Sequence, residues 1–256
     1  MALNSIQICK EYKLSGHIFW GRRSLYFDPG LTGNAYEYFF QNACFDFSER
    51  RVLKGINLPY PPSGDGYSPS ADQNPRRYMK QLIDTFAAPR SDILDQVEIL
   101  RQSQLPTQNV IGVHVRRTDV LTGSEERRTQ PVSNFVRAVD GWLTQHSDGL
   151  VFLATDDTSV VAEFQAHFGD RLRYQDAVRS SDGKSIHGHY DGGLNVSPYQ
   201  KGREALVDAL VLSKTCFLIR CFSFLTNYTL CINPDLKFLD LDKQNLGVVR
   251  TPWIHK

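Results

Sequence analysis

The sequence lacks long apolar runs, an excess of charge of one sign and any Cys-x-x-Cys pair. No stretch approaches the ~18 consecutive apolar residues of a membrane-spanning helix. The N-terminal stretch carries Lys10, Glu11 and Lys13 where a secretion signal would be apolar. The 29 basic and 28 acidic residues nearly balance, which argues against a nucleic acid or a membrane surface as partner. These absences favour a cytoplasmic protein with no transmembrane segment; a luminal domain taken without its anchor is the alternative.

The ligand spacing of a structural zinc site is also missing, because no Cys-x-x-Cys pair and no Cys/His cluster occurs. His187 and His189 stand two residues apart in a long glycine-rich loop, which supports a metal site only weakly and fits a lid or a solvated loop better. We therefore predict no bound metal. We expect reduced thiols at the cysteines: Cys9, Cys44, Cys216, Cys221 and Cys231.

Composition and breakers divide the chain into a small and a large part. Residues 1–57 are rich in aromatic side chains, and residues 58–75 form a linker or loop by their proline, glycine and serine content. Apolar residues at helical spacing then predict helices around 79–86 and 93–100, separated or broken at Pro89. We expect a small N-terminal lobe with its linker over 1–75 and a larger domain over 76–256.

After Pro106 the pattern alternates between strands and helices. Strands are expected at 110–115, 150–155, 171–175, 216–220 and 236–240. Helices are expected at 131–146, 158–168, 200–214 and 223–231. This alternation predicts an α/β fold in which a doubly wound, Rossmann-like parallel sheet carries helices on both faces.

The first expected strand ends in two arginines and an aspartate, Val110-Ile-Gly-Val-His-Val-Arg-Arg-Thr-Asp119. In a strand His114 and Arg116 share one side, and Arg117 falls on the other, so the two guanidinium groups should have different roles. Open α/β sheets bind ligands beyond the carboxyl ends of their strands. A permanent cation with a fork of donors at such an end suits a phosphate group.

The second expected strand ends in two aspartates, Asp156 and Asp157. Asp157 is a good N-cap for the helix that starts at Thr158, and this capping role competes with a role in the site. Asp156 has no such explanation and lies at the same sheet edge as Arg116. The pair could be taken for a metal-binding motif, but no third carboxylate or histidine is nearby in the sequence.

Two further polar residues belong to the later elements. Asp208 lies on the flank of the apolar arc of the helix at 200–214, and carboxylates are rarely buried without a partner. Its partner could be Arg203 or Arg220, or the N–H groups of a ligand. Ser223 follows the fourth strand, where a serine caps a helix whose N-terminus can also bind phosphate.

At these residues the sequence resembles a known family. The segment Val110–Asp119 resembles the first peptide motif of the α1,6-fucosyltransferases, which comprise core fucosyltransferases of animals and nodulation-factor fucosyltransferases of bacteria. Its His-x-Arg-Arg-x-Asp core is shared more loosely with α1,2- and protein O-fucosyltransferases. Leu153–Asp157 is similar to the second motif, and Gly202–Leu212 followed by Phe217–Ser223 is similar to the third. The resemblance covers about residues 75–240, in the same order.

The resemblance implies an inverting, metal-independent glycosyltransferase of the GT-B type that needs no cofactor. It implies GDP-β-L-fucose as the donor and an oligosaccharide or glycolipid as the acceptor, with an α1,6 linkage as one product. The larger domain would then bind the GDP-sugar, and the small lobe would lie on the acceptor side. The luminal alternative would be the domain of a Golgi enzyme.

The resemblance also implies residue roles. Arg116 would bind the β-phosphate and offset the charge on departing GDP, and Arg117 would shape the motif loop with Asp119. His114 and Asp208 would contact the nucleotide, with Asp208 reading guanine. The residues implied for the diphosphate and sugar region are Asp156, Asp157 and Ser223.

Inverting transfer also needs a base for the acceptor hydroxyl. In the core fucosyltransferases a glutamate follows the first motif closely. Here Ser124 occupies that place, and Glu125 and Glu126 come next. We predict Glu125, by a one-residue shift, with Glu126 as the second candidate; a solvated charged loop is the competing interpretation.

The chain also departs from the family. It is much shorter than the animal enzymes, shows no counterpart of their coiled coil or SH3-like domain, and has Val120 where they carry a basic residue. Two alternatives therefore stay open. One is a transferase that uses another GDP-sugar, and the other is a non-catalytic module that binds a nucleotide or a glycan with a relic site.

Overall fold

The computed structural model describes residues 6, 9–22, 24–47, 73–118, 130–186 and 196–241. Its centre is a parallel sheet with the strand order β5-β4-β3-β6-β7. These strands are β3 (Val110–Val115), β4 (Leu150–Thr155), β5 (Leu172–Arg173), β6 (Phe217–Arg220) and β7 (Lys237–Asp240). The chain winds outward from β3 in one direction and then, from β6, in the other. The predicted doubly wound α/β sheet is therefore confirmed, with β5 shorter than expected.

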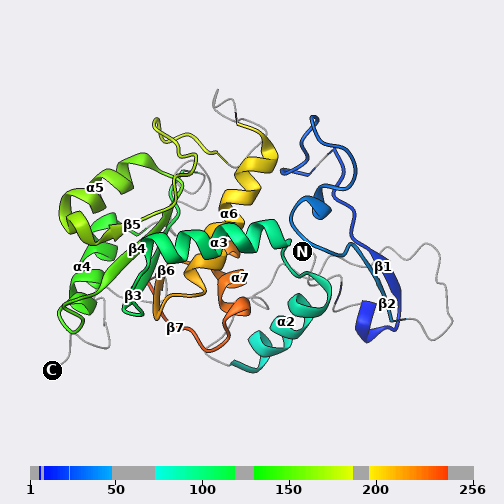
Figure 1. Ribbon diagram of the computed structural model, residues 1–256, viewed down its shortest axis with the longest axis horizontal. Coiled ribbons are helices and arrows are strands. Elements are labelled where there is room, and N and C mark those ends of the chain that lie inside the picture. The colour runs from blue at the N-terminus through cyan, green and yellow to red at the C-terminus, as the bar shows by residue number, and fades with distance from the viewer. Residues whose placement is uncertain are drawn as a thin grey trace.

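Helices cover both faces of the sheet (Figure 1). One face carries α4 (Val132–Leu143) and α5 (Thr158–Phe168), and the other carries α3 (Ser91–Gln104), α6 (Pro198–Leu212) and α7 (Phe224–Ile232). The helix predicted at 200–214, α6, begins earlier than expected because Ser197 caps it and Pro198 occupies its first turn. A further helix, α2 (Gln73–Phe86), is separate from α3, as Pro89 predicted.

The strand β3 alternates as its sequence requires. Ile111, Val113 and Val115 pack in the core with α4 and α5. Gly112 faces α6 instead, and a Cβ there would come within 2.8 Å of Leu212 and Thr215. The glycine lets α6 lie unusually close to the strand that carries the arginine motif.

The N-terminal part is a small unit of aromatic side chains. β1 (Ser15–His17) pairs antiparallel with β2 (Cys44–Asp46), and a short 3-10 helix, η1 (Ala35–Tyr38), lies between them in sequence. Side chains of this part share one core cluster with Met79 and Leu82 of α2. The predicted boundary between 75 and 76 stays a prediction, because residues 48–72 lie outside the described ranges.

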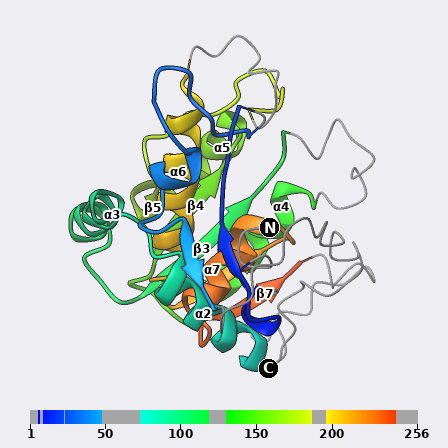
Figure 2. The same cartoon turned by 90° about the vertical axis from the view of Figure 1, so that its right-hand side faces the viewer.

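This N-terminal part lies beside α6 in both views (Figures 1 and 2). The contact is close at Gly202, where a Cβ would come within 2.7 Å of Phe39 and 2.8 Å of Tyr26. Among the residues with described positions, no helix combines the length and apolar character needed to cross a bilayer.

Candidate functional site

The site predicted from sequence lies where the winding of the sheet reverses, between β3 and β6. These strands are neighbours, with His114 opposite Arg220 in the register. The residues that follow them, Arg116 and Arg117 after β3 and Ser223 after β6, therefore emerge at the same edge of the sheet. Ligands of open α/β sheets bind at such a reversal because the two connections leave to opposite faces and open a crevice.

The loop after β3 is folded by Asp156. One carboxylate oxygen of Asp156 accepts the backbone N–H of Arg117 at 2.9 Å, and the other accepts the N–H and the hydroxyl of Thr118 at 3.2 and 2.6 Å. Asp156 is 7% exposed. Its carboxylate therefore orders the arginine loop, and a direct contact with the donor stays a prediction.

Asp157 caps α5, which is the capping role that the sequence predicted for it as an alternative to a role in the site. Its carboxylate accepts the backbone N–H and the hydroxyl of Ser159 at 2.7 and 2.6 Å. It also forms an ion pair with Arg117 at 3.5 Å. Arg117 is thus held toward α5, and its predicted pairing with Asp119 stays a prediction because Asp119 lies outside the described residues.

Arg116 lies near enough to the N-terminal aromatic part for its charge to act on Tyr26. Burial raises the pKa of the Tyr26 hydroxyl, and the positive charge of Arg116 acts in the opposite direction. Tyr26 in turn packs at Gly202 on α6. The two arginines therefore have different neighbours, Asp157 for Arg117 and Tyr26 for Arg116, and their orientation on opposite sides stays a prediction.

His114 and Asp208 lie on the α6 side of the sheet. His114 is 6% exposed and stands two residues beyond Gly112, on the strand face that α6 approaches. Asp208 is 7% exposed. Arg220, one of the partners that the sequence offered for Asp208, pairs with Asp240 instead, and within the described ranges Arg203 forms no ion pair with Asp208.

The carboxyl group of Asp208 is the most perturbed acid of this edge. Burial raises its pKa to about 7; the charge of Arg179 acts against this shift, and that of Glu204 adds to it. Its Oδ1 atom is buried and has no hydrogen-bond partner among the residues that the structure describes. Buried polar atoms are rarely left this way, so the atom is a candidate for contact with a ligand.

Ser223 is the N-cap of α7. Its hydroxyl accepts the backbone N–H of Thr226 at 3.1 Å, and the side chain is 2% exposed. The first-turn N–H groups of α7 face the same edge as Arg116, which suits a phosphate. The serine positions this helix end, and its contact with the diphosphate stays a prediction.

Sequence analysis missed the segment between β5 and α6. Residues 174–179 have no regular secondary structure and lie on α6, where the N–H of Val178 donates to Glu204 at 2.9 Å. This segment brings Gln175 and Arg179 to the neighbourhood of Asp208. In the sequence, Gln175 closes the strand expected at 171–175 and Arg179 follows it, and neither was singled out as a site residue.

Several predicted residues lie outside the described ranges: Asp119, Glu125, Glu126, His187 and His189. Within those ranges, no three His, Cys, Asp or Glu side chains gather around a possible metal position. The catalytic base and the metal-free chemistry therefore stay predictions.

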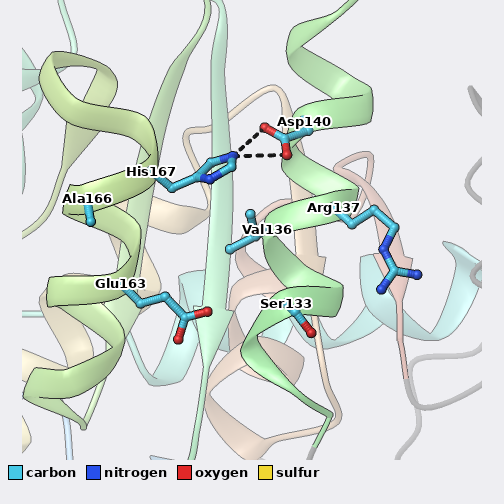
Figure 3. Close-up of a pocket in the computed structure, with 7 residues that line it drawn as sticks. All are labelled: Ser133, Val136, Arg137, Asp140, Glu163, Ala166 and His167. Atoms are coloured by element: carbon cyan, nitrogen blue, oxygen red, sulfur yellow. Dashed lines mark hydrogen bonds and ion pairs between the residues drawn. The ribbon is translucent and has the colours of Figure 1, made fainter.

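A groove on the opposite face of the sheet has no comparable chemistry (Figure 3). It lies between α4 and α5, and His167 there contacts both carboxylate oxygens of Asp140 at 3.0 Å. Both side chains are about half exposed, so the pair contributes little stability. The groove lacks the buried unpaired carboxylate that marks the edge near Asp208.

No protein-family model and no curated protein matches this chain. Solved structures that share part of its fold include NodZ α-1,6-fucosyltransferase soaked with GDP-fucose, with a TM-score of 0.42 and 20% identity over 63% of this chain and 48% of that one. The NodZ structure co-crystallised with GDP gives a TM-score of 0.37 and 20% identity over 56% of this chain and 41% of that one. The structure of POFUT1 in complex with GDP-fucose gives a TM-score of 0.39 and 10% identity over 59% of this chain and 47% of that one.

This chain spans less than half the length of each of these proteins. The TM-scores all lie below 0.5 and the identities at 20% or less. The function of this chain therefore has to be argued from its own residues.

Proposed function

We propose that this chain binds a GDP-sugar and acts as an inverting, metal-independent glycosyltransferase, with GDP-β-L-fucose as donor. One observation carries the proposal: the cation Arg116 and the buried carboxylate of Asp208 belong to the same reversal of the sheet. A cation suits a diphosphate, and a carboxylate suits the N–H groups of guanine. The sequence resemblance of the arginine motif narrows the sugar to L-fucose.

In the proposed reaction, an acceptor hydroxyl oxygen forms a bond to the anomeric carbon as the bond from that carbon to the β-phosphate breaks. The acceptor proton passes to a glutamate, for which Glu125 and Glu126 are the candidates. Negative charge grows on departing GDP, and Arg116 with the N-terminus of α7 would offset it. Groups that are fixed before the reaction stabilise such charge most effectively.

The first test is nucleotide selectivity. We expect GDP to raise the melting temperature of the full chain more than UDP or CMP does, measured by thermal shift and confirmed by calorimetry. If GDP shows no preference over the other two nucleotides, the proposal loses its basis, whichever sugar is considered.

The second test is transfer. GDP-fucose is incubated with chitooligosaccharide and galactoside acceptors, and the products are analysed for linkage, with α1,6 expected first. Arg116→Ala should abolish transfer while the protein stays folded, because the side chain lies beyond a strand end. Arg137→Ala is the matched control, since Arg137 is exposed on α4. GDP binding without transfer to any acceptor would identify a relic site, and transfer from a different GDP-sugar would correct the donor.

A further inference from the structure

The segment after β5 is held against α6 by polar contacts. Gln175 donates its side-chain N–H to the carbonyl oxygen of Glu204 at 3.2 Å, and the N–H of Val178 donates to the carboxylate of Glu204 at 2.9 Å. Arg179 donates to the carbonyl oxygens of Gln175 and Ala177 at 2.6 and 3.0 Å. Glu204 precedes Asp208 by one helical turn, so the segment and Asp208 meet on one face of α6.

Three buried polar atoms of this contact have no hydrogen-bond partner among the described residues: Asp208 Oδ1, Gln175 Oε1 and Arg179 Nε. The orientation of the Gln175 amide is fixed, because only its nitrogen can donate to the Glu204 carbonyl. A buried donor or acceptor that is left unsatisfied destabilises the folded protein. The Arg179 charge acts on Asp208, and Gln175 bonds to α6 one turn before it, so these atoms belong to one contact between the segment and the helix. Together they are a donor and acceptor pattern that a ligand can complete.

We propose that Gln175 and Arg179 form, with Asp208, the pocket that reads the guanine base. This inference rests on the proposed function. Guanine presents donors at N1 and the 2-amino group and an acceptor at O6. Asp208 and Gln175 supply the two acceptors, and the Nε–H group of Arg179 supplies the donor.

The same pattern rejects adenine. Adenine has an amino donor where guanine has O6 and an acceptor at N1, so it would place a donor against Arg179 and an acceptor against Asp208. A site whose buried polar groups are left unpaired by the wrong ligand discriminates strongly.

The test measures binding of GDP, inosine diphosphate and ADP to the full chain by calorimetry. Inosine diphosphate keeps O6 and N1–H but lacks the 2-amino group. We expect GDP to bind the native protein on the order of tenfold more tightly than inosine diphosphate. The preference over ADP should reach on the order of a hundredfold or more.

Two variants assign the roles. Gln175→Leu should reduce the preference for GDP over inosine diphosphate by about tenfold, and Arg179→Met should weaken GDP and inosine diphosphate alike and narrow their advantage over ADP. Arg173→Met is the matched control, because Arg173 also donates to main-chain carbonyls but lies at the other end of the segment, at β5. It should keep all three affinities.

Folded variants with native affinity ratios would overturn the inference and leave the proposed function standing. A native protein that binds GDP in preference to UDP but does not distinguish GDP from ADP would overturn the inference even if the variants fail to fold. A native protein that does not bind GDP would overturn both.

Discussion

Arg220 of β6 and Asp208 of α6 are both buried charged side chains, and each has one buried atom without a hydrogen-bond partner among the described residues, Nε of Arg220 and Oδ1 of Asp208. They differ in that the fold gives Arg220 a counter-ion. Arg220 is fully buried; it donates to Asp240 at 2.9 Å and to Asn227 at 2.7 Å, and its guanidinium lies 5.0 Å from the centre of the Phe238 ring. Asp208 is buried almost as deeply, yet its Oδ1 has no partner within the described residues.

The difference separates structure from function. Removing a charge from water is costly, and an ion pair with good hydrogen bonds recovers most of that cost within the protein. Arg220 and Asp240 do this for each other and join β6 to β7. Asp208 is removed from water but has no ion pair within the described residues to recover that free energy. This is expected of a group that binds a ligand.

The largest effect should follow from breaking the buried ion pair between Arg220 and Asp240. Arg220→Met leaves the Asp240 carboxylate buried without its counter-ion, so we expect a loss of about 3–5 kcal/mol in the free energy of unfolding. Urea denaturation measures it. Arg77→Met is the control, because Arg77 pairs with Asp235 on the surface and should lose less than about 1 kcal/mol. Similar losses in both variants would mean that burial does not matter to the pair.

Asp208→Asn should affect GDP binding more than it affects the stability of the fold. It removes a carboxylate that would accept the N1–H group of guanine, so we expect GDP affinity to fall on the order of a hundredfold. Calorimetry at pH 8 measures binding, and a thermal melt at the same pH measures stability. A variant that loses stability but keeps GDP affinity would place Asp208 with Arg220 as a structural residue.

The stability of this variant follows from the raised pKa of Asp208. Between about pH 4 and pH 7 the folded protein keeps the proton on Asp208 while the unfolded chain loses it, so the wild type loses stability as pH rises through this range. Each unit of pKa corresponds to about 1.4 kcal/mol. Asp208→Asn does not titrate, so its stability relative to the wild type should increase with pH over the same range.

A smaller effect tests the close approach that brings α6 to the arginine strand. Gly112→Ala places a Cβ within 2.8 Å of Leu212 and Thr215, and overpacking of this kind costs about 1–3 kcal/mol. We expect lower stability in urea and weaker GDP binding together, because α6 carries Asp208. Gly30→Ala is the control, since only the Asp28 side chain lies near its Cβ position. If Gly112→Ala is destabilised but keeps its GDP affinity, the close approach of α6 to β3 does not matter for GDP binding, and the prediction is wrong.

The smallest effect is the pH dependence of binding. With a pKa of about 7, Asp208 would be about one-tenth ionised at pH 6 and about nine-tenths at pH 8, so GDP affinity should rise about tenfold over this range. Arg179 favours the ionised form and Glu204 opposes it. Asp208→Asn serves as the reference that contains the titration of the phosphates alone. Parallel pH profiles for the two proteins would contradict this role of Asp208.

Much of the large domain could be predicted because its signals are local. Apolar alternation located β3 and β4, and helical spacing together with Pro89 separated α2 from α3. The capping role of Asp157 followed from its place before a helix. The pairing of Arg220 with Asp240 could not be predicted, because it joins neighbouring strands that are far apart in sequence.

The sequence by itself determined the strand that Arg116 and Arg117 follow, and it predicted that the two side chains leave on opposite sides, because the period of a strand is two residues. Only the tertiary structure decided what each side meets: Asp157 for Arg117, and the side of Tyr26 and α6 for Arg116. It also decided that Asp208 is buried without Arg220 as its partner and within reach of the charge of Arg179. Such pairings depend on which elements pack together, and local patterns of residues carry no information about that.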